Sequence, residues 1–108
     1  MIIHSKKICE SNGKLGFYCP GCDSLHFISV NPNQHPFWYF NNNYEMPTFN
    51  PSILVTFTVK VCHSFIKEGR IDYLSDCSHH LSGKNVKLPD LPQWVLDGNF
   101  INPNYYPE

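Results

Sequence analysis

The sequence has little charge, and no part of it is strongly acidic or basic. Only 16% of the 108 residues are charged, the net charge is −1, and no run of like charge exceeds two residues. A basic nucleic-acid footprint is therefore not supported. No apolar stretch approaches the ~20 residues of a membrane helix, and residues 1–7 lack the apolar core of a signal peptide. We therefore expect a soluble protein in the cytosol, with no membrane partner.

Helical periodicity and internal repeats are also missing, whereas aromatic residues make up 15% of the chain beside nine prolines and six glycines. Aromatic and β-branched residues favour strands, and proline and glycine favour tight turns. The length predicts one domain. We expect a mainly β fold: a small single-domain antiparallel sheet over residues 1–108, with a zinc knuckle, hairpins and little or no helix. Its motif-bearing core would span about 15–90, followed by a proline-rich tail at 88–108.

The first half of the chain predicts one hairpin and one further strand. Residues 2–9 and 14–19 read as strands on either side of Ser11-Asn12-Gly13, a plausible hairpin turn. Residues 25–30 read as a strand that leaves the tight turn at residues 19–22. These elements predict a strand–knuckle–strand unit, in which the knuckle is the tight turn at residues 19–22 between two strands.

The second half contains the longest β signal. Apolar residues alternate with polar ones over residues 53–66, which marks one buried face. Residues 67–70 are a hairpin turn, and residues 71–74 return as the partner strand. Residues 46–52 hold two prolines, so we expect an ordered loop there rather than a central strand. One short helical turn is expected near residues 93–97.

The five cysteines point to a metal site rather than to disulfides. Their number is odd, and thiols stay reduced in the cytosol. Cys19-Pro20-Gly21-Cys22 is a C-x-x-C turn, which is often half of a zinc site or a redox pair. A redox pair of the thioredoxin type begins a helix, and no helix is expected here. Zinc prefers thiolate and imidazole ligands in a tetrahedral array, so the turn predicts bound Zn²⁺.

Two further ligands are needed, and the register of the second hairpin selects them. The candidates are Cys62, His63, Cys77, His79 and His80, with His26 nearer the knuckle. If Ile66 pairs with Ile71, Cys62 and Cys77 lie on one face of the hairpin. A slip by one residue brings His63 to that face instead.

The first register is the one that common hairpin loops produce. We therefore predict that zinc is bound by Cys19, Cys22, Cys62 and Cys77. The alternative is that His63 or His79 replaces one of the cysteines.

Three polar residues near the predicted metal are candidates for catalysis. If only three cysteines bind, a water molecule takes the open position, and His63, Asp76 or His79 could act as general base. Otherwise these side chains would orient ligands and turns. The H-E-x-x-H, deaminase and P-loop motifs are absent.

The loop at residues 46–52 carries Thr48, Asn50 and Ser52 on a rigid, proline-rich segment. Functional side chains often lie on such loops. These residue types more commonly close turns through hydrogen bonds from side chain to backbone, so both roles stay open.

Six motifs follow one another along the chain: Phe17–Cys22, Trp38, Pro47–Val55, Cys62–Ile66, Gly69–Ile71 and Leu74–Cys77. In this order they resemble a small family common in bacteriophage genomes, often labelled "ammonia monooxygenase". An enzyme of that name does not suit 108 residues without a membrane span. A more distant similarity joins the chain to bacterial proteins encoded beside ubiquitin-like conjugation genes. Those proteins share the early cysteine pair, Pro51-Ser52-Ile53 and Cys62, but have no counterpart of Cys77.

The resemblance implies a phage accessory protein that binds a host or phage protein, in the host cytosol if the chain is phage-encoded. We expect a zinc-stabilised interaction module, which could inhibit a host antiviral defence. Its contact surface could include Tyr39, Tyr105, Tyr106 and Trp38, although core packing is the more common role for a residue such as Trp38. The alternative is a zinc-dependent hydrolase, a peptidase or isopeptidase, that uses His63, Asp76 or His79 beside the metal.

Overall fold

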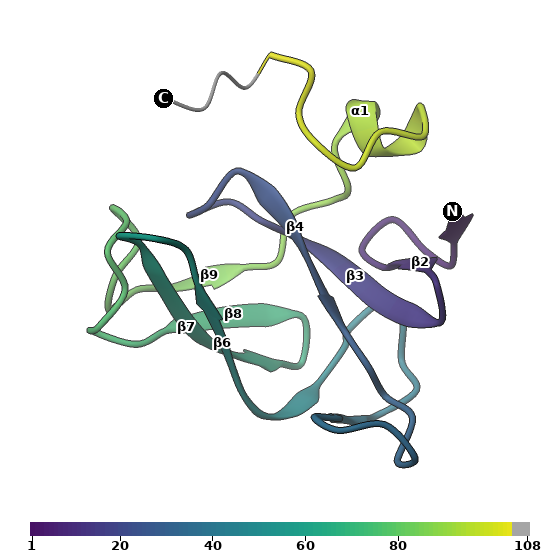
Figure 1. The fold of residues 1–108 in the computed structure, drawn as a ribbon, viewed down its shortest axis with the longest axis horizontal. Helices are drawn as coiled ribbons and strands as arrows, with labels where there is room; N and C mark the ends of the chain where they lie inside the picture. Colours follow the sequence, from purple (N-terminus) through teal and green to yellow (C-terminus); the bar gives the residue numbers. More distant parts are fainter. Residues whose placement is uncertain (105–108) are drawn as a thin grey trace.

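A computed structural model describes residues 1–104, which form two antiparallel sheets and one short helix (Figure 1). The mainly β prediction is confirmed. The first sheet has the strand order β1 (Ile2–Ile3), β2 (Cys9–Ser11), β3 (Lys14–Cys19) and β4 (Ser24–Ile28). The second has the order β5 (Tyr39–Phe40), β6 (Phe49–Thr56), β7 (Val61–Lys67), β8 (Arg70–Tyr73) and β9 (Asn85–Lys87), and α1 (Gln93–Leu96) follows it.

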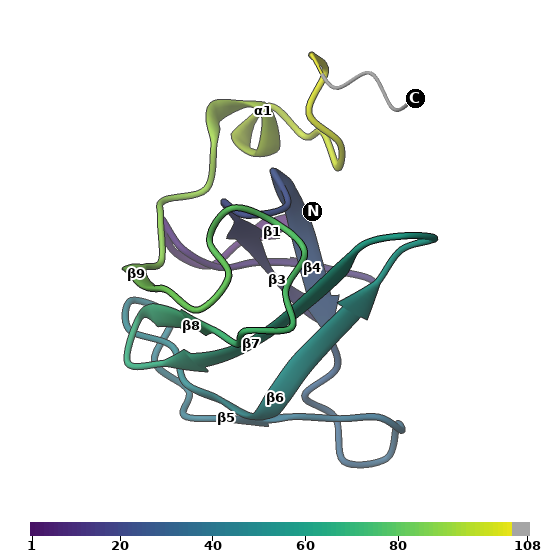
Figure 2. The same ribbon diagram turned by 90° about the vertical axis from the view of Figure 1, so that its left-hand side faces the viewer.

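The first sheet lies between the second sheet and α1 (Figures 1 and 2). Alternating residues of β3 explain this arrangement, because successive side chains of a strand point to opposite faces. Phe17 lies in the core between the sheets, where its ring is 6.4 Å from that of Phe49. Tyr18 points the other way and packs against the small cluster around Val95 of α1.

The β7–β8 hairpin has the predicted register, because Ile66 pairs with Ile71. Burial along β7 alternates accordingly, so that Cys62 faces the core and His63 faces outwards. Phe65, two residues further along the outer face, is exposed. The second sheet therefore has one face in the core and one face towards solvent.

The predicted loop at residues 46–52 is wrong in its second half, because Phe49 begins β6. The strand tolerates Pro51 at an irregularity: the ladder with β7 shifts register between Phe49 and Ile53. A proline at a bulge leaves no ladder hydrogen bond unmade. Ser52 consequently lies on a sheet strand.

The single β segment predicted at residues 53–66 is also wrong in detail, because a turn interrupts it. The Phe57 backbone N–H donates to the Lys60 carbonyl oxygen over 2.8 Å. Phe57 and Val59 continue the apolar alternation but are exposed. Alternation alone therefore did not locate the end of β6.

The predicted helical turn is confirmed as α1. Tyr105 and Tyr106 of the expected contact surface lie outside the described residues. Among residues 1–104, no helix has the length and hydropathy needed to cross a membrane.

Candidate active site and thiol cluster

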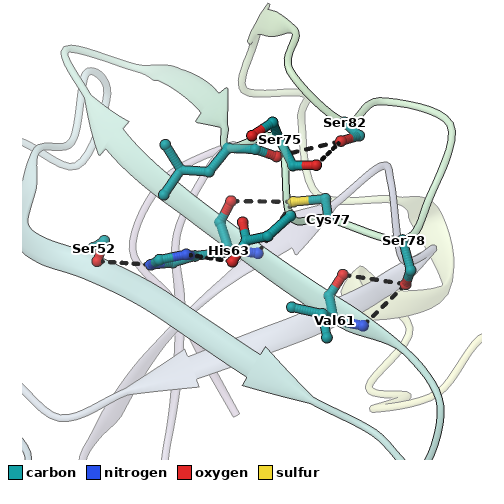
Figure 3. Close-up of polar contacts among 9 residues, drawn as sticks. Ser52, Val61, His63, Ser75, Cys77, Ser78 and Ser82 are labelled. Carbon is teal, nitrogen blue, oxygen red and sulfur yellow. Dashed lines mark hydrogen bonds and ion pairs between the residues drawn. The ribbon is translucent and has the colours of Figure 1, made fainter.

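Ser52, His63 and Asp76 form a continuous hydrogen-bonded chain on the outer face of the second sheet. The Ser52 Oγ lies 3.0 Å from His63 Nε2, and His63 Nδ1 lies 3.0 Å from an Asp76 carboxylate oxygen. Figure 3 shows the imidazole of β7 between the serine of β6 and the loop that follows β8. The hydrogen-bonding order is nucleophile, base and acid, as in a catalytic triad.

The Asp76 carboxylate determines which ring nitrogen of His63 carries the proton. An ionised Asp76 only accepts hydrogen bonds, so His63 Nδ1 carries the proton and donates it. Nε2 of the neutral ring is then an acceptor, and the Ser52 hydroxyl donates to it. A serine with its proton directed at an imidazole nitrogen is prepared for deprotonation.

The pairing of β6 with β7 places Ser52 diagonally next to the histidine. Leu54 pairs with His63 across the ladder, and Ser52 lies two residues before Leu54. Trp38 holds this part of the strand from the other side, since its indole Nε1 donates to the Ser52 carbonyl oxygen over 3.2 Å.

The loop that carries Asp76 is fastened to β7 at both of its ends. Leu74 N donates to the His63 carbonyl oxygen over 2.9 Å, and Ser78 N donates to the Val61 carbonyl oxygen over 2.9 Å. Within the loop, Cys77 N donates to the Leu74 carbonyl oxygen over 3.2 Å. These bonds place Asp76 beside the outward-facing imidazole.

The imidazole and the carboxylate of the site are both partly exposed to solvent. The His63 side chain is 24% exposed and that of Asp76 is 55% exposed. A hollow of about 410 Å³ lies along the same face, and its lining includes Asn50 and Phe65, each two residues from a triad member. Its polar lining includes Arg70 and Asp72 on β8.

On the core side of the same sheet lies a cluster of metal-ligand side chains, which we call the thiol cluster. Its ligand atoms all lie within 4.8 Å of one another and come from Cys19, Cys22, His26 and Cys62. The Cys19 and Cys62 sulfurs are 3.8 Å apart. Two sulfurs bound at about 2.3 Å to one tetrahedral zinc ion would lie about 3.8 Å apart.

His26 fits this cluster as a ligand. Its Nε2 is buried and has no hydrogen-bond partner among the described residues, and such buried polar atoms are rare in native structures. The opposite side of the ring packs in the core, with its centroid 5.6 Å from that of Phe17. A cation among the three sulfurs would satisfy the nitrogen.

The thiols of the cluster shift one another's pKa values in opposite directions. Hydrogen bonds from Cys22 and Cys62 lower the pKa of Cys19 far below its ordinary value. Hydrogen bonds to Cys19 raise the pKa of Cys22 to about 12 and also raise the pKa of Cys62. Burial raises the pKa of Tyr73, whose hydroxyl lies 3.1 Å from the Cys19 sulfur. This is the environment of a thiolate ligand with a hydrogen-bonded neighbour.

The structure therefore brings together three of the four predicted zinc ligands with His26 as the fourth. Cys77 belongs to an overlapping group with Cys62 and His79. The Cys77 sulfur accepts a hydrogen bond from the His63 backbone N–H over 3.2 Å and donates to the His63 carbonyl oxygen over 3.1 Å.

His63 and Asp76 lie together as catalytic candidates, whereas His79 lies apart from them. The His79 ring packs edge-on against Tyr73 with centroids 4.6 Å apart. The ring also lies against the knuckle, because a Cβ placed on Gly21 would be 2.4 Å from the nearest atom of the His79 ring. His80 is exposed and belongs to neither group of ligands.

Sequence reasoning did not connect Ser52 with His63 or choose His26. The signal for Ser52 was its place among polar residues on a proline-rich segment. For His26 the signal was an inward position on a strand that pairs with β3, since His26 lies opposite Phe17.

A β domain that presents serine, histidine and aspartate in this order has the site architecture of a serine hydrolase. A family described as "Bacterial ubiquitination-like system serine protease (BubE)" matches residues 2–74 of the 108. The chain belongs to the BubE family. Comparisons with curated proteins and with solved structures found no match.

The matched segment contains Ser52 and His63, while Asp76 lies just after it. The family description concerns a bacterial system. It lends no support to the "ammonia monooxygenase" label, and the expected bacteriophage origin and inhibition of a host defence stay predictions.

Proposed function

We propose that this protein is a serine peptidase with Ser52 as nucleophile, His63 as general base and Asp76 as the group that orients the base. The observation that carries the proposal is the unbroken set of contacts from the Ser52 hydroxyl through the imidazole to the carboxylate. The family description supports the reaction class and suggests a substrate, an amide or isopeptide bond in a ubiquitination-like system.

The reaction follows from the proton arrangement. As Ser52 Oγ forms a bond to the substrate carbonyl carbon, its proton passes to His63 Nε2, and Asp76 stabilises the imidazolium. The imidazolium then protonates the leaving amine as the carbon–nitrogen bond breaks, which leaves an ester on Ser52. Water, deprotonated by His63, hydrolyses that ester.

This proposal keeps the peptidase part of the alternative drawn from the sequence but changes its chemistry. The nucleophile is a side-chain hydroxyl rather than metal-bound water. His63 and Asp76 keep roles in proton transfer, and His79 supports the knuckle instead. The polar contacts among Ser52, His63 and Asp76 on the outer face of the second sheet are accounted for by peptidase chemistry, without an interaction-module function.

The experiment is covalent labelling with a fluorophosphonate, a reagent that reads out an activated serine without knowledge of the substrate. Ser52 Oγ forms a bond to phosphorus, fluoride leaves, and the serine proton passes to His63. We expect the unmodified protein to be labelled and both Ser52→Ala and His63→Ala to lose labelling. Ser75→Ala, at an exposed serine of the neighbouring loop, is the matched control and should label normally. Equal labelling of all four proteins would falsify the proposal.

We also propose a structural zinc ion at the thiol cluster, with Cys19, Cys22, Cys62 and His26 as ligands. The cluster geometry and the unpartnered His26 nitrogen support it. The set predicted from the sequence, with Cys77 as the fourth ligand, is the competing arrangement.

Metal content separates the two arrangements. We expect one zinc per chain, loss of zinc in Cys19→Ser and His26→Ala, and retention in Cys77→Ser. Cys9→Ser is the matched control, because Cys9 is a buried cysteine in the other apolar cluster. Zinc loss in Cys77→Ser with retention in His26→Ala would support Cys77 as the ligand instead.

A further inference from the structure

The Cys77 thiol bridges the peptide groups of the proposed catalytic base. Its sulfur contacts both the backbone N–H and the backbone carbonyl oxygen of His63, at 3.2 and 3.1 Å. A single side chain that meets both polar groups of one residue limits the rotation and translation of that residue along the strand. Cys77 is 8% exposed, so water does not compete freely for these contacts.

Cys77 also follows Asp76 directly in the chain. The same thiol therefore fastens the carboxylate's loop to the imidazole's strand. The Cys77 N–H donates within that loop to the Leu74 carbonyl oxygen, which gives the residue a third fixed point.

A neighbouring residue makes the same kind of bridge away from the triad. The Ser78 hydroxyl accepts a hydrogen bond from Val61 N over 2.9 Å and donates to the Val61 carbonyl oxygen over 3.3 Å. Figure 3 shows the two contacts of Ser78 with Val61 and the contact of the Cys77 sulfur with the His63 carbonyl oxygen. The Cys77 bridge contacts His63, which belongs to the triad, whereas the Ser78 bridge contacts Val61, which does not.

We propose that Cys77 is a positioning residue of the triad: its thiol fixes the His63 peptide and the Asp76 loop relative to one another. This proposal rests on the proposed serine chemistry. It assigns to Cys77 a role outside the zinc site, in place of the ligand role predicted from the sequence. Serine at this position would keep one donor and one acceptor, whereas alanine and valine would keep neither.

The test measures the kinetics of fluorophosphonate labelling on zinc-loaded Cys77→Ala, Cys77→Ser and Ser78→Ala. For each we would determine the labelling rate constant at saturating reagent, the half-saturating reagent concentration, the zinc content and the urea midpoint. Cys77→Val, which keeps apolar volume, is the second variant without a hydrogen-bonding atom and replaces Cys77→Ala if that variant does not fold.

We expect Cys77→Ala to lower the saturated rate constant by roughly 10- to 100-fold, because small displacements of catalytic groups cost that much. Zinc content and half-saturation should stay unchanged. Cys77→Ser should recover most of the rate, and Ser78→Ala should lose comparable stability but keep the rate.

Three results would overturn the proposal: an unchanged rate in the variants that lack the bridge, an equal fall in Ser78→Ala, or a fall in Cys77→Ala that Cys77→Ser does not recover. Loss of zinc in Cys77→Ala would also overturn it, because Cys77 would then be a ligand. Absence of labelling in the unmodified protein would instead overturn the proposed function.

Discussion

Cys62 and His63 are consecutive residues of β7 whose side chains lie on opposite faces of the second sheet. Cys62 is 1% exposed and lies in the thiol cluster, while His63 is partly exposed and contacts Ser52. The two-residue period of a strand produces this division. A metal bound on the core face would therefore fix the strand that carries the base without entering the reaction.

Asp76→Asn should abolish most of the activity without unfolding the protein. An asparagine amide can donate to His63 Nδ1, which favours the ring tautomer with its proton on Nε2, where it cannot accept from Ser52. The corresponding change in a serine protease triad lowers kcat on the order of 10⁴-fold. Labelling rates would check this, with Asp97→Asn, at the exposed end of α1, as the control. A rate within threefold of the unmodified protein would exclude Asp76 from the triad.

Trp38→Phe should reduce both stability and labelling. The substitution removes the indole N–H that holds the Ser52 carbonyl oxygen and leaves a small gap at a half-buried site. We expect a loss of about 1–3 kcal/mol in the free energy of unfolding, measured by urea denaturation. Trp94→Phe, at the half-buried tryptophan of α1, is the control and should leave the labelling rate unchanged. Equal rates in the two variants would mean that Trp38 does not hold the nucleophile.

Gly21→Ala should destabilise the knuckle, because the new Cβ would lie within 2.4–2.6 Å of the His79 ring. Overpacking of this kind typically costs about 1–3 kcal/mol. The double variant Gly21→Ala/His79→Ala removes the obstructing ring, so its stability should match that of His79→Ala alone. Additive losses in this double-mutant cycle would show that the ring is not the cause.

Removal of the metal should unfold the protein or loosen it severely. Structural zinc sites in small domains contribute on the order of 10 kcal/mol to folding. We expect a chelator to abolish the cooperative thermal transition followed by circular dichroism, and added Zn²⁺ to restore it. Mg²⁺ should not restore it, since it prefers oxygen ligands. A transition unaffected by complete loss of zinc would rule out the structural role.

The β7–β8 hairpin was predictable from the sequence because turn chemistry and alternation agree there. The turn holds Glu68 and Gly69 with positive φ, and the apolar residues alternate across it. The pairing of Ile66 with Ile71 follows, and with it the inward position of Cys62. Local rules are sufficient where both partners of a contact lie on one hairpin.

The triad was not predictable in the same way, because its serine comes from a strand with an irregular register. Pro51 argues against a strand, yet the shift between Phe49 and Ile53 accommodates it. No local pattern predicts that a segment with two prolines joins the sheet at such an irregularity, and so the contact between Ser52 and His63 could not be predicted. His26 could not be selected as a ligand for a related reason, because its distance from Cys62 depends on how the two sheets pack.

The most direct test of the central claim is to locate the phosphonyl group on the zinc-loaded protein by tandem mass spectrometry after fluorophosphonate treatment. The triad predicts one adduct per chain, on Ser52, and none when His63 is replaced by alanine. An adduct on another residue, or one on Ser52 that forms equally fast without His63, would contradict the account.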